Sequence, residues 1–391
     1  MPAKIRRDGV SATFVPLVLI PGLVVASLVA LSGAEAASQQ PNCGDTITTD
    51  TTLHKDLVNC PNIGIIIGAD DVTLDLNYHT IDGDAAPCTG CHPRTEFTDI
   101  GVLNDGHDGV TVVHGSMRQF DAGAVVGEAR HNRVLGISSS RNRFIGIVVF
   151  DSARSVFRGS SGSGSLDRHE AAGLLLLSSR HVRILHNSFR HSAHNGIVTA
   201  DSNNNLIKGN VFSGNDDEGI LMEGGERNRI KRNRFVRNGG GITLGPGSRN
   251  VITRNHVSRV RDGIRIEKGR GNLVAHNVVA HAHRAGIRLG ITNPVFGGAH
   301  NIVRGNLVKG SRVDGFLVTE KDDHSVLKRN VARRAGDDGF DIRSHSAKLT
   351  RNRALRNGDL GIAAVRGVID GGGNIARHNG DPRQCTHIAC R

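Results

Sequence analysis

The apolar residues of this chain come in short alternating runs that return every 22 or 23 residues between residues 195 and 306. In each copy a glycine is followed by apolar residues at every second position and then by two asparagines five positions apart. Alternation at a period of two, bounded by Gly, Asn and Ser, is typical of β-strands separated by turns. The glycines that open the five copies are Gly196, Gly219, Gly241, Gly263 and Gly286.

A repeat of this length indicates stacked units that bury their apolar faces against one another. No run in a unit is long enough for the helix of a helical or leucine-rich repeat. Three short strands and three turns per unit predict one rung of a parallel β-helix, whose strands pair with those of the next rung about 4.8 Å away. A first rung begins at Gly64, and the glycine register continues at Gly101, Gly123, Gly146, Gly173, Gly315, Gly339 and Gly361. We therefore predict an all-β, single-domain solenoid of about 13 rungs, most of them 22–24 residues long.

Asparagines recur at two positions of the repeat. Asn tolerates the left-handed turn conformation, and its amide can hydrogen-bond the identical residue one rung away. Surface turns that were merely rich in Asn would not keep two registers, so we predict two Asn ladders. The first holds Asn132, Asn205, Asn228, Asn250, Asn272, Asn301 and Asn374, and the second Asn187, Asn210, Asn233, Asn255, Asn277, Asn306, Asn330, Asn352 and Asn379.

This repeat resembles that of right-handed parallel β-helix repeat proteins, in the pectate-lyase-like superfamily that also includes the periplasmic NosD-type proteins. The resemblance covers roughly residues 60–380. It implies a right-handed solenoid. The superfamily contains lyases, hydrolases, epimerases and non-enzymes, so the resemblance specifies the fold far better than the function.

The N-terminal residues have the pattern of a secretory signal peptide. Basic residues precede an apolar run over residues 14–31, and Ala34 and Ala36 supply the small side chains of a cleavage site. A retained membrane anchor is the alternative, although Pro16 and Pro21 interrupt the run. We expect a secreted, extracellular or periplasmic protein without a membrane segment after cleavage. The predicted divisions are a signal peptide (1–36), an N-terminal cap (37–62), the β-helix (63–380) and a C-terminal cap (381–391).

Six cysteines in an exported protein are expected to be oxidised. They form three local pairs, and we interpret the outer two as staples at the ends of the solenoid, where open strand edges need protection. The middle pair, followed by His92, is either a loop disulfide, which we favour, or a metal or redox site. The pairs are Cys43 with Cys60, Cys88 with Cys91, and Cys385 with Cys390.

Two rungs are longer than the others, because extra residues fall within 160–172 and 291–300. The first insertion lies just before a glycine strand and the second just after one. Together they frame the outer glycine-strand face over five rungs, a groove of roughly 24 Å. Outward strand positions change within this stretch from an apolar strip, which includes Val125 and Val148, to the arginines Arg265 and Arg288. The strip is expected to be covered by a loop or by residues before Cys43, or else to contact a partner subunit.

Carboxylates and arginines mixed on such a face suit uronic-acid chemistry, with Arg holding the substrate carboxylate and Asp or Glu acting as acid or base. Asp217 and Asp262 lie two rungs apart, about 10 Å, near the upper end of the separation in inverting glycosidases. The alternative is a solvated face in which Arg265 and Arg288 are paired with Glu267 and Glu223. The catalytic candidates are Asp217, Glu218 and Asp262, and the substrate-binding candidates are His194, Glu223, Arg265, Glu267 and Arg288.

Polygalacturonases carry their catalytic residues on this strand, and two of their four signatures have a counterpart here. Asp217-Glu218, or alternatively Asp337-Asp338, resembles their Asp-Asp pair, and Arg265 resembles the arginine of Arg-Ile-Lys, with Glu267 in the lysine position. Residues 239–241 lack the histidine of Gly-His-Gly, and residues 194–196 do not match Asn-Thr-Asp. Polygalacturonase activity is therefore disfavoured. The clustered Asp-Pro-His motif associated with alginate epimerases is not found either.

Composition narrows the partners. A net charge of +12 and a pI of about 10.0 favour an anionic partner. With no Trp and a single Tyr, the chain lacks the stacking platforms of nucleic-acid binders. Beyond the signal segment only Met117 and Met222 remain, and the histidines are scattered over turns, which disfavours a copper site. We identify no cofactor and no metal site, and keep calcium as a candidate ion.

We therefore expect a monomer that binds acidic polysaccharide on its outer strand face and is a candidate lyase, hydrolase or epimerase. The first alternative is a non-catalytic surface or adhesion protein with the solenoid as spacer. The second is a NosD-like periplasmic protein with a metal-related role.

Overall fold

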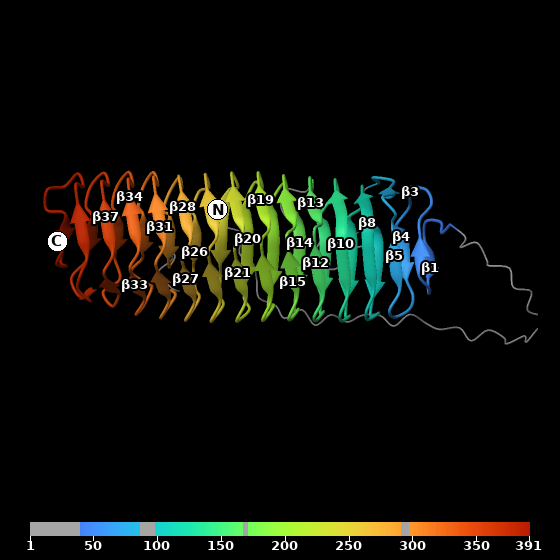
Figure 1. The fold of residues 1–391 in the computed structure, drawn as a ribbon, viewed down its shortest axis with the longest axis horizontal. Helices are drawn as coiled ribbons and strands as arrows, with labels where there is room; N and C mark the ends of the chain where they lie inside the picture. Colours follow the sequence, from blue (N-terminus) through green and yellow to red (C-terminus); the bar gives the residue numbers. More distant parts are fainter. Residues whose placement is uncertain (1–39, 87–97, 167–170, 291–296) are drawn as a thin grey trace, which may run out of the picture. The chain divides into compact units, whose positions relative to one another are not determined.

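The computed structural model describes residues 40–86, 98–166, 171–290 and 297–391. These belong to one compact unit, residues 40–391. In these ranges the regular structure consists of β-strands and no helix, which confirms the predicted all-β class. Figure 1 shows the strands following one another along the solenoid from the N-terminal to the C-terminal rungs. The predicted signal peptide lies outside the described residues.

Each rung contributes one strand to each of three parallel columns, as the repeat predicted. The first column is a 15-stranded parallel sheet that contains the glycine strands. Its members are β1 (Asp45–Ile47), β4 (Ile63–Ile67), β7 (Ile100–Asp105), β9 (Ala122–Gly127), β11 (Ile145–Phe150), β14 (Ala172–Leu177), β17 (Asn195–Ala200), β20 (Glu218–Glu223), β23 (Gly240–Leu244), β26 (Ile264–Ile266), β29 (Ile287–Leu289), β32 (Phe316–Val318), β35 (Phe340–Ile342), β38 (Ile362–Ala364) and β41 (Cys385–Thr386).

The other two columns are joined where β8 (Thr111–Arg118) and β10 (Arg133–Ser140) run through both. The second column contains β2 (Thr51–Thr52), β5 (Thr73–Asp75), β12 (Val156–Arg158), β15 (Arg183–Leu185), β18 (Leu206–Lys208), β21 (Arg229–Lys231), β24 (Val251–Thr253), β27 (Leu273–Ala275), β30 (Ile302–Arg304), β33 (Val326–Lys328), β36 (Lys348–Thr350) and β39 (Ile369–Asp370). The third contains β3 (Leu57–Cys60), β6 (Thr80–Gly83), β13 (Ser161–Ser163), β16 (Ser188–Arg190), β19 (Val211–Ser213), β22 (Arg234–Val236), β25 (His256–Ser258), β28 (Val278–Ala280), β31 (Leu307–Lys309), β34 (Val331–Arg333), β37 (Arg353–Leu355) and β40 (Ile375–Arg377).

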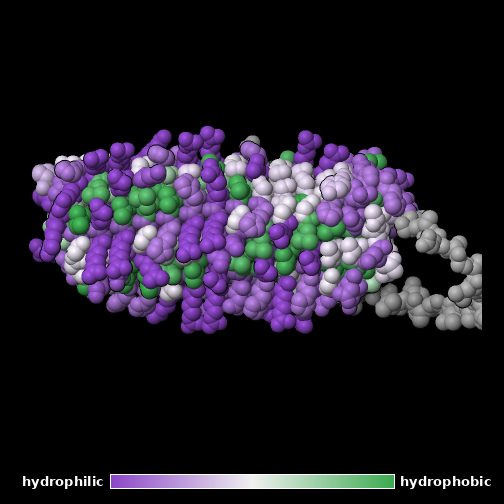
Figure 2. Space-filling model, in the orientation of Figure 1, coloured by the Kyte–Doolittle hydropathy of each residue, from purple (hydrophilic) through white to green (hydrophobic). Residues whose placement is uncertain are grey.

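The core lies inside the solenoid and is built by the inward residues of all three columns. Equivalent residues of successive rungs stack, because a parallel register places identical positions next to each other. Phe189, Phe212 and Phe235 stack with ring centroids 5.4 and 4.6 Å apart. The outside is mostly hydrophilic in the view of Figure 2, although hydrophobic residues gather in patches on it.

The predicted apolar strip lies on the outer side of the first sheet and is largely buried. Val125 and Val148 are only 4% and 3% exposed, and they form a second apolar cluster with Phe144. Leu175 and Val198 pack against this cluster. The expectation that the strip is covered is thus met at Val125 and Val148.

The two Asn ladders are confirmed, and a third exists at the remaining corner. The Asn210 side chain accepts the backbone N–H of Asn187 at 2.8 Å and donates to the Ile184 carbonyl and the Asn233 side chain, both at 3.0 Å. The third ladder, which the prediction did not separate, includes Asn215, Asn238, Asn357 and Asn379.

Two ladder assignments near the C-terminus were wrong. Asn374 continues the second ladder, because Asn352 donates to its side chain, and Asn379 continues the third. The last turn has Val368 rather than Asn at its first corner. Asn374 and Asn379 therefore stand at the second and third corners of this turn, each one corner later than we assigned it.

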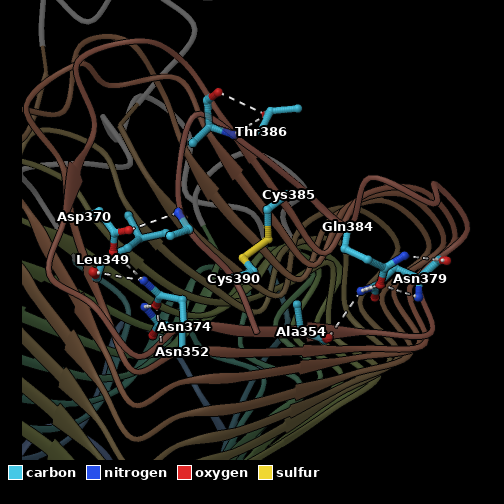
Figure 3. The surroundings of a disulfide bond; sticks show 12 residues. Leu349, Asn352, Ala354, Asp370, Asn374, Asn379, Gln384, Cys385, Thr386 and Cys390 are labelled. Carbon is cyan, nitrogen blue, oxygen red and sulfur yellow. Dashed lines mark hydrogen bonds between the residues drawn. A yellow bond between two sulfur atoms is a disulfide. The ribbon is translucent and has the colours of Figure 1, made fainter.

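Disulfides staple both ends. Cys43 bonds Cys60, and Cys385 bonds Cys390 beside the last Asn residues (Figure 3). Cys88 and Cys91 lie outside the described residues. The first sheet has two strands more than the predicted 13 rungs, because β1 and β41, whose residues we assigned to the two caps, pair at its ends. Within the described ranges no helix has the length and hydrophobicity needed to cross a membrane.

Candidate functional site

Glu218 is the central residue of the predicted site. It opens β20 with its backbone N–H donating to the Asn195 side chain at 3.1 Å. Its side chain is 5% exposed, although it stands on the outer side of the first sheet. Oε1 accepts a charge-assisted hydrogen bond from the Arg265 guanidinium at 2.9 Å and one from the Thr243 hydroxyl at 3.2 Å. These two partners come from the next rungs, β23 and β26.

The pKa of Glu218 is raised to about 7, and burial is the largest cause. The hydrogen bond with Asp217 and the negative charge of Asp217 also raise this pKa, whereas Arg265 and Arg261 lower it. A carboxyl group with a pKa near neutrality can both donate and accept a proton under physiological conditions. Glu218 therefore has the properties of a general acid or base.

Asp217 lies at the more exposed edge of the same network. Its Oδ1 is 3.5 Å from Arg261, and its Oδ2 is 3.4 Å from the His194 Nε2. Arg261 also approaches Glu218 Oε1 at 3.9 Å, and Arg265 reaches Glu267 at 3.2 Å. Three carboxylates and two arginines, contributed by rungs more than 40 residues apart in sequence, are thus joined in one network.

Asp262 and Arg288 lie beside this network with unsatisfied polar atoms. Asp262 is 5% exposed, and its Oδ1 accepts the Ala285 N–H at 3.2 Å. Its Oδ2 and the Arg288 Nε are buried without a hydrogen-bond partner. Burial lowers the pKa of Arg288, and the Asp262 charge raises it. Buried groups left unpaired in this way are costly, and a bound ligand would satisfy them.

The structure thus brings most of the predicted residues together. His194, Asp217, Glu218, Arg265 and Glu267 share one network, and Asp262 and Arg288 adjoin it. Glu223 does not join them, since it is exposed at the far end of β20. Of the alternative salt bridges, Arg265 with Glu267 is present, and Arg288 with Glu223 is not among the ion pairs of the described residues. The predicted framing loops lie partly outside the described ranges.

Sequence reasoning missed Arg261 and Thr243. Arg261 precedes Asp262 by one residue and occupies the repeat position of Asp217 two rungs earlier. Aligning the residues before each glycine, as well as those after it, would have found it. Thr243 occupies the outward strand position of Arg265, one rung before it.

A second acidic cluster lies further along the same sheet edge. Carboxylate oxygens of Asp314, Asp338 and Asp341 lie within 4.8 Å of one another. Burial and the neighbouring aspartates raise the pKa values of Asp314 and Asp338 to about 7. Arg343 binds Asp341 at 2.6 Å. Asp338 belongs to the Asp337-Asp338 pair that was the second candidate for the Asp-Asp signature.

The described residues do not fit a copper site. Met117 and Met222 are buried in the core, and the four described cysteines are in disulfides. In the described part of the chain, the groups able to hold an ion consist of aspartates, with no His, Cys or Met. Copper favours nitrogen and sulfur ligands, so this chemistry disagrees with a copper centre.

Comparisons with known proteins bear on the fold. A family model described as the right handed beta helix region matches residues 172–295, and the model of the periplasmic copper-binding protein NosD matches residues 239–371. No curated protein gives a significant sequence match.

Two solved structures illustrate the similarity. A hyperthermoactive exopolygalacturonase from Thermotoga maritima superposes with a TM-score of 0.53 at 11% identity, covering 73% of this chain and 84% of that one. The A-module of the mannuronan C-5 epimerase AlgE4 from Azotobacter vinelandii gives 0.51 at 14% identity, covering 78% and 80%. At these identities the similarity shows the fold alone. The chain has the right-handed parallel β-helix fold, as the repeat resemblance implied.

Proposed function

We propose that this protein binds uronate-containing polysaccharide on the outer face of the first sheet and that Glu218 acts there as general acid or base. The observation that carries the proposal is the environment of Glu218. Its carboxyl group is buried, has a pKa of about 7, and is held between Asp217 and Arg265. A surface ion pair placed only for solubility would have neither the burial nor the raised pKa.

The neighbouring cations suit a uronate substrate. Arg288 has an unpaired Nε and stands one rung beyond Arg265 in direct register. A guanidinium binds a carboxylate through two parallel hydrogen bonds. Neutralising the substrate carboxylate in this way makes the adjacent carbon-bound proton easier to remove, and Glu218 or Asp262 then accepts or returns the proton. This chemistry is common to elimination and epimerisation, and an acid is equally required for hydrolysis.

The comparisons are compatible with this proposal. The exopolygalacturonase and the mannuronan epimerase share the fold, and their names place uronate chains among their substrates. An extracellular or periplasmic location fits the stapled ends, the expected signal peptide and the periplasmic description of the NosD model. Polysaccharide is accessible in such a location.

The test is an activity and binding screen of the mature protein on polygalacturonate, alginate, hyaluronan and heparin, with and without calcium. Ultraviolet absorbance of unsaturated products, reducing ends and the configuration at C5 by NMR distinguish lyase, hydrolase and epimerase. Glu218→Gln should lower turnover by about 100-fold or more, since general acid–base catalysis contributes that much. Glu226→Gln, the same change at an exposed corner of the same rung, should leave turnover unaltered.

A non-catalytic spacer or adhesion protein is the second candidate. It is favoured by the extent to which Arg265 is already occupied by Glu218 and Glu267. Absence of turnover and of binding to every polyanion would leave this candidate ahead. Turnover that survives Glu218→Gln unchanged would show that the chemistry lies elsewhere.

A further inference from the structure

A trough lined by basic side chains runs along the third corner of the solenoid, the corner that carries the third ladder. It lies between the strands of the third column and the N-terminal ends of the first-sheet strands that follow them. It encloses about 840 Å³. Two rows of side chains flank it, on either side of the buried residues of the third ladder. The basic residues that line it are Arg237, Arg259, His281, His283 and Arg312, and we call this feature the corner trough.

The local backbone explains why the trough exists. The residue before each ladder position is in the left-handed conformation, with φ values of 56° at Arg237 and 55° at Arg259 and His281. Such residues project outward at the corner. In the second row Gly239 leaves a gap, and a Cβ there would lie 2.2 Å from the Asp216 carbonyl oxygen. Glycine is therefore required at this point, and its missing side chain helps to hollow the trough.

The positive charge of the corner trough is not neutralised by the protein. Across the described residues, none of its five basic side chains takes part in an ion pair, and the only carboxylate in its lining is that of Asp216. Arg261, by contrast, occupies the second row between Gly239 and His283 but turns to Asp217. Cations one rung apart, about 4.8 Å, repel one another until an anion binds between them.

The side chains that line the trough indicate which class of anionic ligand it would bind. Arginine forks recognise carboxylate, sulfate and phosphate groups alike. Arg237 and Arg259 repeat a guanidinium on successive rungs, and His281 continues the row, which suits an extended chain with regularly spaced anionic groups. The lining contains no Phe, Tyr or Trp, so the stacking that holds single-stranded nucleic acid is missing. An acidic polysaccharide fits these features better than a nucleic acid.

We propose that the corner trough binds the carboxylate or sulfate groups of an acidic polysaccharide, as a subsite distinct from the sheet face. This proposal rests on the proposed function: the corner trough would bind the part of the polysaccharide that flanks the sugar unit held at Glu218. Arg261 connects the two places, because it belongs to the second row and reaches Asp217 at 3.5 Å. Longer oligosaccharides should therefore gain affinity that short ones do not.

The test compares two double variants with the same charge change. Arg237→Asn with Arg259→Asn removes the trough cations, and Arg232→Asn with Arg254→Asn removes the equivalent cations from the second corner of the same rungs. All four positions have φ values of 55° to 56°, which asparagine tolerates. Equilibrium binding is measured with oligogalacturonates of increasing length, heparin oligosaccharides, a single-stranded oligonucleotide of equal charge and a neutral dextran.

The trough variant should bind the longer acidic oligosaccharides at least about fivefold more weakly, and the second-corner variant should bind them nearly as the parent does. The dependence of log Kd on log salt concentration should also become shallower by about 2 in the trough variant alone. A preference between the galacturonate and heparin series identifies the anionic group as carboxylate or sulfate.

Equal weakening by both variants would overturn the proposal, since it would indicate a general field rather than a site. Tighter binding of the oligonucleotide, lost in the trough variant, would overturn the choice of ligand. If the parent protein binds but shows no turnover, the catalytic proposal fails and the trough proposal stands. If the parent protein shows turnover and the trough substitutions do not change the affinity for any oligosaccharide, the trough proposal fails and the catalytic proposal stands.

Discussion

Arginine and histidine occupy left-handed backbone positions here that proteins more often give to glycine or asparagine. Arg227, Arg232 and Arg237 take the three corners of one rung with φ values of 55°, 56° and 56°. The conformation costs about 1 kcal/mol or more at each such residue. Buried Asn side chains one residue further along offset this cost through their hydrogen bonds. Part of the positive charge of the chain is consequently presented at the corners.

Glu218→Gln should flatten the dependence of stability on pH. The folded protein raises the pKa of Glu218 from 4.5 to about 7, so the protonated carboxyl stabilises the fold fully below about pH 4.5. That contribution is lost as the pH rises through about 7. Glutamine cannot ionise, so the variant should be more stable relative to the parent at pH 8 than at pH 4, by up to about 3 kcal/mol.

Urea unfolding of the parent and of Glu218→Gln across this pH range provides the measurement. Glu226→Gln serves as the control, because Glu226 is exposed and has only a long ion pair with Arg249, at 3.7 Å. A constant difference between Glu218→Gln and the parent at every pH would contradict the raised pKa.

At the scale of the element, the Asn ladders hold the corners of the rungs together. Asn233 accepts the backbone N–H of Asn210 at 2.9 Å and its side-chain amide at 3.0 Å. Its own amide donates to the Ile207 carbonyl and to Asn255, both at 3.0 Å. All of these atoms are buried, so each bond removed leaves a polar group without a partner.

Asn233→Ala should therefore destabilise the protein by about 3 kcal/mol or more. Asn203→Ala is the matched control, because the Asn203 bonds are solvent-exposed and should cost less than about 1 kcal/mol to remove. Urea unfolding gives the totals, and hydrogen exchange of β19 and β22 gives the local effect. If the two variants lost the same free energy of unfolding, burial of the Asn ladder would not contribute to stability.

At the scale of the whole molecule, the 22- or 23-residue sequence repeat predicted the fold almost completely. A glycine register with alternating apolar residues determines which side chains face inward, and this located thirteen of the fifteen strands in the first sheet. β1 and β41 were not counted because we assigned their residues to the caps. Gly44 stands at the glycine position before β1, and Gln384 stands there before β41. The third ladder was not identified from the sequence, because Ser192, Val260 and Ala282 interrupt its asparagines.

The site was less predictable than the fold, for a physical reason. The period places Asp217, Glu218 and Arg265 on the outer face, but it does not say how deeply a side chain is buried. The raised pKa of Glu218 depends on that depth. Strand position also does not show that Glu223, which the sequence placed beside the others, lies at the far, exposed end of β20.

Opening the C-terminal staple should loosen one end of the molecule without unfolding the rest. Cys385→Ser with Cys390→Ser removes a bridge across only 5 residues, and β41 pairs with β38 alone. Loss of this bridge weakens mainly the last turn, which can open without the rest of the solenoid, so the global unfolding midpoint should scarcely move. Hydrogen exchange in β38 and β41 should accelerate by about tenfold or more.

The N-terminal pair, Cys43→Ser with Cys60→Ser, is the comparison. It closes a longer segment, a sequence separation of 17, and Cys60 is fully buried. Its removal should cost about 3 kcal/mol. A global loss from the C-terminal variant equal to that from the N-terminal one would contradict the local role of the C-terminal staple.

The stapled ends also determine how the molecule would respond to tension. Each rung is bonded only to its two neighbours, so a pulling force on the chain ends acts on the outermost turns first. Once a staple is reduced, turns should detach singly, each releasing roughly 75 Å of extended chain for a 22-residue repeat. With both staples closed, the terminal turns resist the load until a disulfide is reduced, so the force needed to detach them depends on redox conditions.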